Sequence, residues 1–156
     1  MAASTSATAD GASRELILTR VFDAPRRVVF KMWTEPEHAA RWWGPQGHTA
    51  ISCRMEVRPG GIWDRRMRAP DGSTYRKYGV YREVVSPERL VFTYVTEDSA
   101  GVLDQETVVT VRFEELGGKT RLTLHQALFA TAELCVSHQG GWTSCFERFA
   151  RYLQAP

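Results

Sequence analysis

Six consecutive segments with alternating apolar and polar residues, followed by one long helical segment, constrain the fold of this chain more than any other feature. The alternating segments lie between about residue 49 and residue 127, and most are joined by short turns such as Pro59-Gly60-Gly61 and Asp71-Gly72. Strands joined by turns this short pair antiparallel, because a parallel pair needs a crossover of about a dozen residues or more. The sequence therefore predicts six consecutive antiparallel strands.

The helical segment covers about Thr131 to Leu153 and has one apolar face. Residues recur on this face at three- and four-residue steps, as in an amphipathic helix: Leu134, His138, Trp142, Cys145, Phe149 and Leu153. At about 1.5 Å per residue the helix would be ~34 Å long, enough to cross a whole domain. Gly140 and Gly141 interrupt it, and each costs about 1 kcal/mol relative to alanine. We therefore expect the helix to approach either the sheet or a ligand closely at this point.

The first part of the chain contributes one strand and two short helices. A β-rich segment covers residues 15–22, and Asp23-Ala24-Pro25 ends it before two short helical segments. The element order is therefore β-α-α-β6-α, which predicts an α+β protein with seven strands. The 156 residues fit one domain, which we place at residues 14–154. Residues 1–13 are expected to form a disordered tail.

This element order and four local stretches resemble the SRPBCC superfamily of START, polyketide cyclase and pollen-allergen-like proteins. The resemblance is closer still to the family named after the activator of the ninety-kilodalton heat-shock protein's ATPase. The stretches are Asp23-Ala24-Pro25 leading into VFKMWTEPEHAARWWGP, then Arg58-Pro59-Gly60-Gly61, YGVYREVVSPERLVFTY and GGWTSCFERFARYL. The resemblance implies a helix-grip fold, in which a curved seven-stranded antiparallel sheet surrounds a long C-terminal helix and leaves a deep cavity. It implies no particular reaction.

Composition and motifs narrow the classes of function. A net charge of +2 is too small to indicate binding to nucleic acid or to an anionic membrane. No apolar run approaches the ~18 residues of a membrane span, and the N-terminus does not resemble a secretory signal. The three cysteines show no CxxC spacing and the four histidines no HExxH motif, so we expect neither a metal nor a cofactor. Reduced cysteines are typical of a cytoplasmic protein, here a monomer or a homodimer.

Ten residues are the candidate lining of the cavity, because large apolar and aromatic side chains line most small-molecule sites. They are Trp33, Trp42, Trp63, Met67, Tyr78, Tyr81, Phe92, His125, His138 and Trp142. His138 could donate to a ligand or act as an acid or base, since histidine titrates near neutral pH. The alternative is structural: His138 would lie at the seam between helix and sheet, and the tryptophans would pack the short helices onto the sheet.

Trp63, Arg65 and Met67 share one face of a strand, because side chains alternate along it. We favour this face as the inner one. The arginines of DRRMRA and YRKY are nevertheless expected on a solvated sheet face or edge, since a buried guanidinium is unfavourable without an anion. If Arg65 points inward, the sequence implies an acidic ligand or a glutamate beside it.

Three functions remain open. The leading hypothesis is binding of a hydrophobic or amphipathic small molecule. The second is an enzyme that uses the same cavity for acid–base cyclisation, dehydration or hydrolysis, with a perturbed pKa in its wall. The third, implied by the family name, is interaction with a chaperone ATPase. We favour the third least, because the co-chaperones behind the name carry an additional N-terminal domain and the tail here is about 14 residues long.

Overall fold

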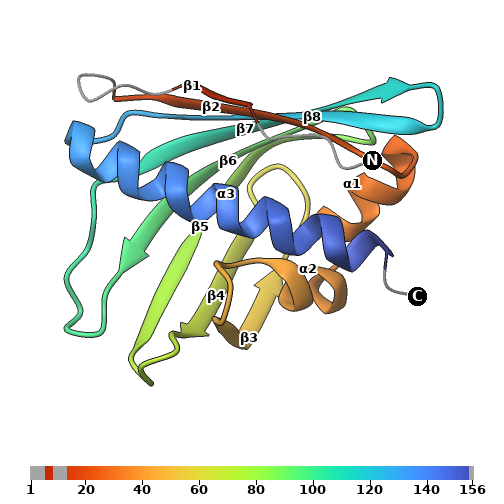
Figure 1. Cartoon of the computed structure of the whole chain (residues 1–156). Helices are drawn as coiled ribbons and strands as arrows, with labels where there is room; N and C mark the ends of the chain where they lie inside the picture. Colours follow the sequence, from red (N-terminus) through yellow and green to blue (C-terminus); the bar gives the residue numbers. More distant parts are fainter. Residues whose placement is uncertain (1–5, 9–13, 155–156) are drawn as a thin grey trace.

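The computed structural model describes residues 6–8 and 14–154, and it contains an antiparallel sheet wrapped around one long helix (Figure 1). The elements, in chain order, are β1 (Ser6–Thr8), β2 (Leu16–Phe22), α1 (Arg26–Thr34), α2 (Pro36–Trp42), β3 (Thr49–Met55), β4 (Ile62–Arg68), β5 (Thr74–Val85), β6 (Arg89–Glu97), β7 (Thr107–Leu116), β8 (Lys119–Ala127) and α3 (Ala132–Gln154). The strands follow the order β1-β2-β8-β7-β6-β5-β4-β3 in the sheet. α3 crosses the concave face, and α1 and α2 lie beside its C-terminal half.

The predicted α+β helix-grip fold and its element order are confirmed. β2 to β8 are the seven predicted strands, and the two short helices follow the first of them. β1 adds three residues to the edge of β2, where Ala7 is opposite Leu18. An unpaired strand edge offers free backbone donors and acceptors to any such segment. Of the tail that we expect to be disordered, Ser6–Thr8 form β1, and residues 1–5 and 9–13 lie outside the described residues.

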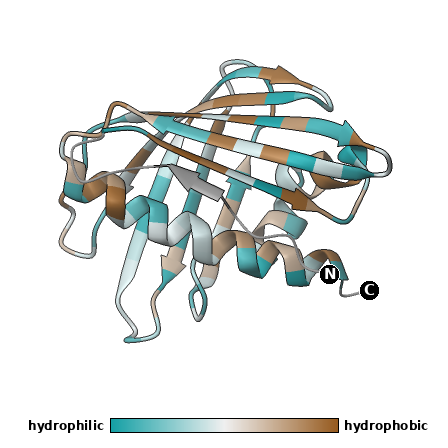
Figure 2. Cartoon of the chain, turned by 45° about the horizontal axis from the view of Figure 1, so that its top comes forward, coloured by the Kyte–Doolittle hydropathy of each residue, from teal (hydrophilic) through white to brown (hydrophobic). Residues whose placement is uncertain are grey.

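Alternation along the strands decides which side chains face α3. On β4, Trp63, Arg65 and Met67 are at most 2% exposed, whereas Ile62, Arg66 and Arg68 of the alternate positions are exposed. Figure 2 shows hydrophobic and hydrophilic residues alternating along the strands in the same way. Trp63, Arg65 and Met67 therefore lie on the inner face of β4, as we predicted.

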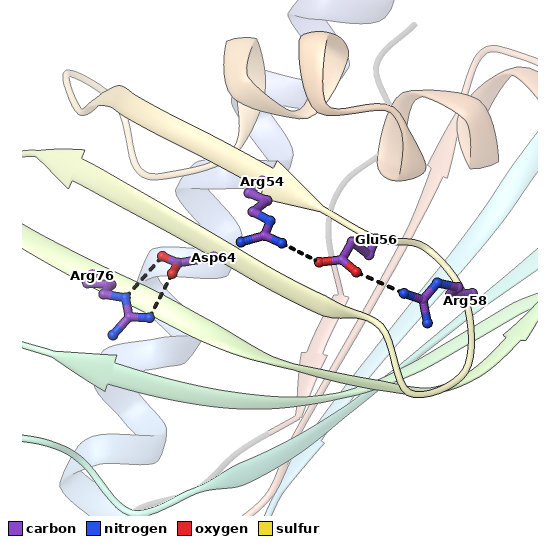
Figure 3. A network of polar contacts seen from close by, with 5 residues as sticks. All are labelled: Arg54, Glu56, Arg58, Asp64 and Arg76. Carbon is purple, nitrogen blue, oxygen red and sulfur yellow. Dashed lines mark hydrogen bonds and ion pairs between the residues drawn. The ribbon is translucent and has the colours of Figure 1, made fainter.

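Ion pairs occupy the outer side of β3, β4 and β5 (Figure 3). Arg76 donates to both carboxylate oxygens of Asp64, from Nε at 3.0 Å and from Nη2 at 2.7 Å. Glu56 accepts one hydrogen bond from Arg54 and one from Arg58, each 2.9 Å long. Exposed pairs of this kind contribute roughly 0–1 kcal/mol each to stability. Of the arginines of DRRMRA and YRKY, Arg66, Arg68 and Arg76 lie on this outer face, as predicted.

Aromatic packing along its C-terminal half holds α3 in place. Phe22 of β2 lies edge-on to Phe146 and Phe149, at ring-centroid distances of 5.7 and 5.0 Å. Trp42 of α2 contacts Phe149 from the other side, at 4.5 Å. Farther toward the N-terminus of α3, a Cβ added at Gly140 or Gly141 would meet nothing within 4 Å. The glycines are therefore not explained by a close approach to the sheet, and the ligand alternative stays a prediction.

Gly79 allows Trp63 to cross β5 and reach β6. Gly79 is directly opposite Trp63, whose Nε1 donates to the Thr93 carbonyl oxygen at 3.0 Å. The ladder between β5 and β6 opens here, and the Val80 N–H donates to the Thr93 Oγ1 at 2.8 Å instead. A Cβ at Gly79 would collide with the Thr93 carbonyl group and would lie 2.7 Å from Trp63 Nε1. The position thus requires a residue without a side chain.

We predict that Gly79→Ala destabilises the protein by roughly 1–3 kcal/mol or more, because the clash involves backbone that cannot move aside. Chemical denaturation monitored by tryptophan fluorescence measures the change. Gly140→Ala is the matched control, since open space surrounds that position and alanine favours a helix by up to about 1 kcal/mol over glycine. Equal stabilities of the two variants would contradict this account of Gly79.

Candidate functional site

A cavity of about 290 Å³, partly open to solvent, lies between the N-terminal half of α3 and the inner face of β4, β5 and β6. Three groups of residues form its wall. α3 provides Leu134, Ser137, His138, Gly141, Trp142 and Cys145; the strands provide Arg65, Met67, Tyr75, Lys77, Tyr94 and Thr96; the segments between elements provide Trp43, Gly44, Pro45, His48 and Asp104.

The apolar face of α3 forms one side of this cavity because its residues recur every three or four positions. Trp142 closes the inner end, where its ring lies 5.3 Å from that of Trp43 and 6.2 Å from that of Trp33. A buried chain of hydrogen bonds fixes the indole: Trp142 Nε1 donates to Gln126 Oε1, and Gln126 Nε2 donates to Thr107 Oγ1, each at 2.8 Å. The inner wall is therefore rigid.

The segment after α2 forms the opposite rim, and Arg148 of α3 holds it. Nη1 of Arg148 donates to the carbonyl oxygens of Gly44, Pro45 and His48, at 3.2, 3.2 and 3.0 Å. These three residues line the cavity. The charge of Arg148 is thus directed at backbone dipoles of the rim.

The structure places three of the ten predicted lining residues, Met67, His138 and Trp142, in the cavity wall. Five others belong to the buried core behind it: Trp33, Trp42, Trp63, Tyr81 and Phe92. These five are large and apolar as expected, but they fill the space between α1, α2 and the sheet with their own rings. Sequence alone could not separate the filled end of the fold from the open one, because both ends are rich in aromatic residues.

The other two predicted residues, Tyr78 and His125, lie on the outer face of the sheet. Tyr78 is opposite Asp64 and packs under the guanidinium of Arg76, 4.1 Å from its ring centroid. His125 lies 3.2 Å from a carboxylate oxygen of Glu15. The prediction that Tyr78 and His125 line the cavity is therefore wrong. Tyr78 is three residues from the inward Tyr81, and an odd spacing in a strand puts two side chains on opposite faces.

Lys77 and Trp43 are lining residues that were missing from the prediction. The hairpin signal at Asp71-Gly72 could have identified Lys77. A turn centred there pairs Arg68 with Thr74, and the same register puts Lys77 opposite Arg65. Trp43 carried no such signal, since either member of the Trp42–Trp43 pair could have faced the cavity.

Arg65 is buried in the wall, with 1% of its surface exposed. Its guanidinium stacks 3.4 Å above the ring centroid of Trp43, and Nη2 makes a weak contact with the Met55 sulfur at 3.4 Å. Nε and Nη1 have no hydrogen-bond partner among the described residues. Burial lowers the pKa of Arg65, although a guanidinium stays charged in proteins. The expectation of a solvated Arg65 is therefore wrong, because the alternation of β4 puts it inside.

Burial also shifts the pKa values of other ionisable residues in the cavity wall. It lowers the pKa of Lys77 to about 8. Burial, helped by repulsion from Lys77, lowers the pKa of His138 to about 3, so the imidazole is neutral at physiological pH. Burial raises the pKa of Cys145 to about 11, which keeps this thiol protonated. Arg65 and Lys77 are therefore the cationic side chains of the wall, His138 is neutral and Cys145 is not an activated thiolate.

Two classes of site find no support in the part of the chain that the structure describes. No group of three or more histidine, cysteine, aspartate or glutamate side chains is arranged to hold a metal ion within residues 6–8 and 14–154. In the same residues, no helix combines the length and the apolar character that crossing a bilayer requires.

Comparison with solved structures supports the fold over nearly the whole chain. A protein of Arthrobacter aurescens is 26% identical with a TM-score of 0.82, and the match covers 97% of this chain and 92% of that one. A protein of Mycobacterium smegmatis is 25% identical with a TM-score of 0.81, covering 97% and 98%. The AHSA1 protein of Silicibacter pomeroyi is 25% identical with a TM-score of 0.80, covering 90% and 97%.

Comparison of sequences leads to the family. No curated protein matches this chain. A family model, described as Activator of Hsp90 ATPase homolog 1-like protein, matches residues 23–154, which include every element from α1 to α3. The match agrees with the helix-grip architecture of the SRPBCC superfamily. The chain belongs to the Activator of Hsp90 ATPase homolog 1-like family.

Proposed function

We propose that this protein binds a hydrophobic or amphipathic small molecule in the cavity between the sheet and α3. The observation that carries the proposal is the cavity itself, about 290 Å³ of space beside Gly141 that the described side chains leave empty. Small-molecule pockets typically measure ~300–1,000 Å³ and combine apolar walls with a few polar groups. Trp43, Met67 and Leu134 supply apolar surface, and Tyr75, Ser137 and His138 supply polar groups.

Rigidity of the wall favours binding as well. Trp142 is fixed through Gln126, and the rim is fixed through Arg148. A preformed site avoids the loss of conformational entropy that would otherwise oppose association. Gly141 contributes by leaving room for a ligand beside the backbone of α3.

An enzyme that performs acid–base chemistry in the same cavity is the second candidate, and the shifted pKa values of Lys77 and His138 are the observation in its favour. A histidine with a pKa of about 3 is a weak base at neutral pH, however, because few protons bind to it there. Lys77, with a pKa of about 8, is mostly protonated at neutral pH and is better suited to donate a proton. Binding requires no proton transfer by either residue and is the simpler interpretation of the cavity wall.

Interaction with a chaperone ATPase, the third hypothesis, rests on the description of the family alone. No feature of the cavity favours it. A pull-down with the chaperone and an assay of its ATPase rate would test it directly.

We predict that a cavity ligand raises the melting temperature of the protein and that Gly141→Leu abolishes the effect. A ligand at 100 times its Kd stabilises by about 2.7 kcal/mol, which corresponds to a Tm increase of roughly 5–10 °C. The leucine side chain would occupy the space beside α3. A thermal-shift screen against lipids and aromatic metabolites, followed by native mass spectrometry, makes the measurement.

Gly140→Leu is the control for this experiment. It introduces the same side chain one residue earlier, at an exposed position outside the cavity wall. This variant should respond to ligand as the wild type does. Ligand binding by Gly141→Leu with unchanged affinity would argue that the ligand occupies another place.

We also predict that His138 makes the protein less stable in acid. Its pKa is about 3 when folded and ~6.5 in an unfolded chain, so the unfolded state binds the proton more readily. Stability is therefore full above about pH 6.5 and is lost progressively toward about pH 3. Between about pH 7 and pH 5, the wild type should lose on the order of 2 kcal/mol more than His138→Leu.

Chemical denaturation at the two pH values measures this difference. Identical pH dependence of His138→Leu and the wild type would show that His138 is not held neutral in the cavity wall.

A further inference from the structure

Two cationic side chains face each other inside the cavity wall. Arg65 of β4 is directly opposite Lys77 of β5 in the antiparallel ladder, and both line the cavity. Side chains that are opposite in such a ladder have their Cβ atoms about 4.5–5.5 Å apart, and like charges in these positions repel each other. The arrangement opposes folding unless something between the two cations carries negative charge.

Neither cation has an anionic partner among the described residues. No carboxylate oxygen of these residues lies within 4.0 Å of a nitrogen atom of either side chain, and Asp104 acts on Lys77 only at longer range, where it raises the pKa of the lysine. Lys77 Nζ has the Thr96 Oγ1 at 3.4 Å and the faces of the Tyr94 and Tyr75 rings at 5.0 and 5.8 Å. Arg65 Nε and Nη1, which carry three of the five N–H donors of a guanidinium, have no hydrogen-bond partner in the part of the chain that the structure describes. Desolvated donors of this kind are unfavourable when left unpaired.

Other arginines of low exposure have acceptors for their donors: two pair with carboxylates, and Arg148 donates to four carbonyl oxygens. Arg20, which is 6% exposed, lies 2.7 Å from an oxygen of Glu147. Arg76, on the outer side of the same strand as Lys77, makes two hydrogen bonds to Asp64 (Figure 3). Arg65 is more deeply buried than either, yet no acidic residue is placed beside it. Arg65, the exception, is a lining residue of the cavity.

The charges of the residues that line the cavity do not sum to zero. Arg65 and Lys77 are cationic, and Asp104 is the one carboxylate among the lining residues. The residues that α3 turns toward the cavity include no acid, and the rim contributes His48, whose pKa burial lowers. With the histidines neutral, one uncompensated positive charge remains. A ligand with a single negative charge would neutralise it.

We propose that the ligand of this cavity is an organic acid, with its carboxylate held by Arg65 and Lys77 and its apolar body along Trp43, Leu134 and the open side of Gly141. This inference rests on the proposed function and names the chemical class of the ligand. Arginine offers a planar set of donors and lysine a point charge, and both bind carboxylates through charge-assisted hydrogen bonds.

Isothermal titration calorimetry with matched acids and esters tests the proposal. The probes are decanoate and naphthoate, the methyl ester of each acid, and inorganic sulfate. The wild type should bind at least one acid about 10- to 100-fold more tightly than its ester, since a hydrogen bond to a charged group typically contributes that factor. Arg65→Met and Lys77→Met should each remove most of this preference.

Arg66→Met is the matched control, because Arg66 is the next residue of β4 and is exposed on the outer face. It should bind the acids as the wild type does. Without ligand, Arg65→Met should melt at a higher temperature than the wild type, because an unpaired buried charge has been removed. A purely structural role of Arg65 against Trp43 predicts a lower melting temperature instead, and that result would overturn the inference.

The outcomes also separate this inference from the proposed function. Equal affinity for acids and esters, or acid binding that survives Arg65→Met, would overturn the carboxylate site and leave the cavity function standing. Sulfate binding as tight as that of the acids, with the same dependence on Arg65, would identify a site for inorganic anions and overturn the organic acid. Absence of binding by every acid and ester would overturn both proposals.

Discussion

Aromatic contact between the C-terminal half of α3 and the elements around it is the interaction on which the rest of the structure depends. Phe146 and Phe149 pack against Phe22 of β2, and Trp42 of α2 contacts Phe149 as well. Edge-to-face pairs add about 0.5–1.5 kcal/mol each beyond the apolar area that they bury. Because this half of the helix is anchored so firmly, the other half can stand away from the sheet. The cavity occupies the space between the N-terminal half of α3 and the sheet, beside Gly141.

Charged residues are paired differently on the outer and inner faces of β4 and β5. On the outer face, Asp64 and Arg76 pair across β4 and β5, where water screens them and their net effect on stability is small. On the inner face, one residue along each strand, Arg65 and Lys77 meet without a carboxylate between them. An interior pair of like charges reduces the stability of the empty protein. Such a loss is typical of binding sites, where strain or unpaired charge is compensated by the ligand.

The protonation states of the wall residues support the proposed binding of a ligand more than the alternative of proton transfer. His138 is held neutral by burial, and Cys145 keeps its proton for the same reason. Trp142, fixed through Gln126 to the sheet, gives the cavity a rigid end. Several solved members of the fold with 25% to 26% identity share this architecture over nearly their whole length. A shared fold does not by itself fix a function, which depends on the side chains of the site.

The sequence by itself determined the element order, the antiparallel hairpins and the apolar face of α3, because these follow from local periodicity and turn residues. It also determined the register of β4 with β5, through the turn at Asp71-Gly72, and hence the Arg65–Lys77 pair. Only the tertiary structure decided which aromatic residues fill the core and which line the cavity, since Trp33 and Trp142 have the same local signature. That distinction depends on where α1 and α2 dock against α3, a contact between segments about 100 residues apart. Local pattern cannot encode it, because the volume left empty is what remains after all the side chains have packed.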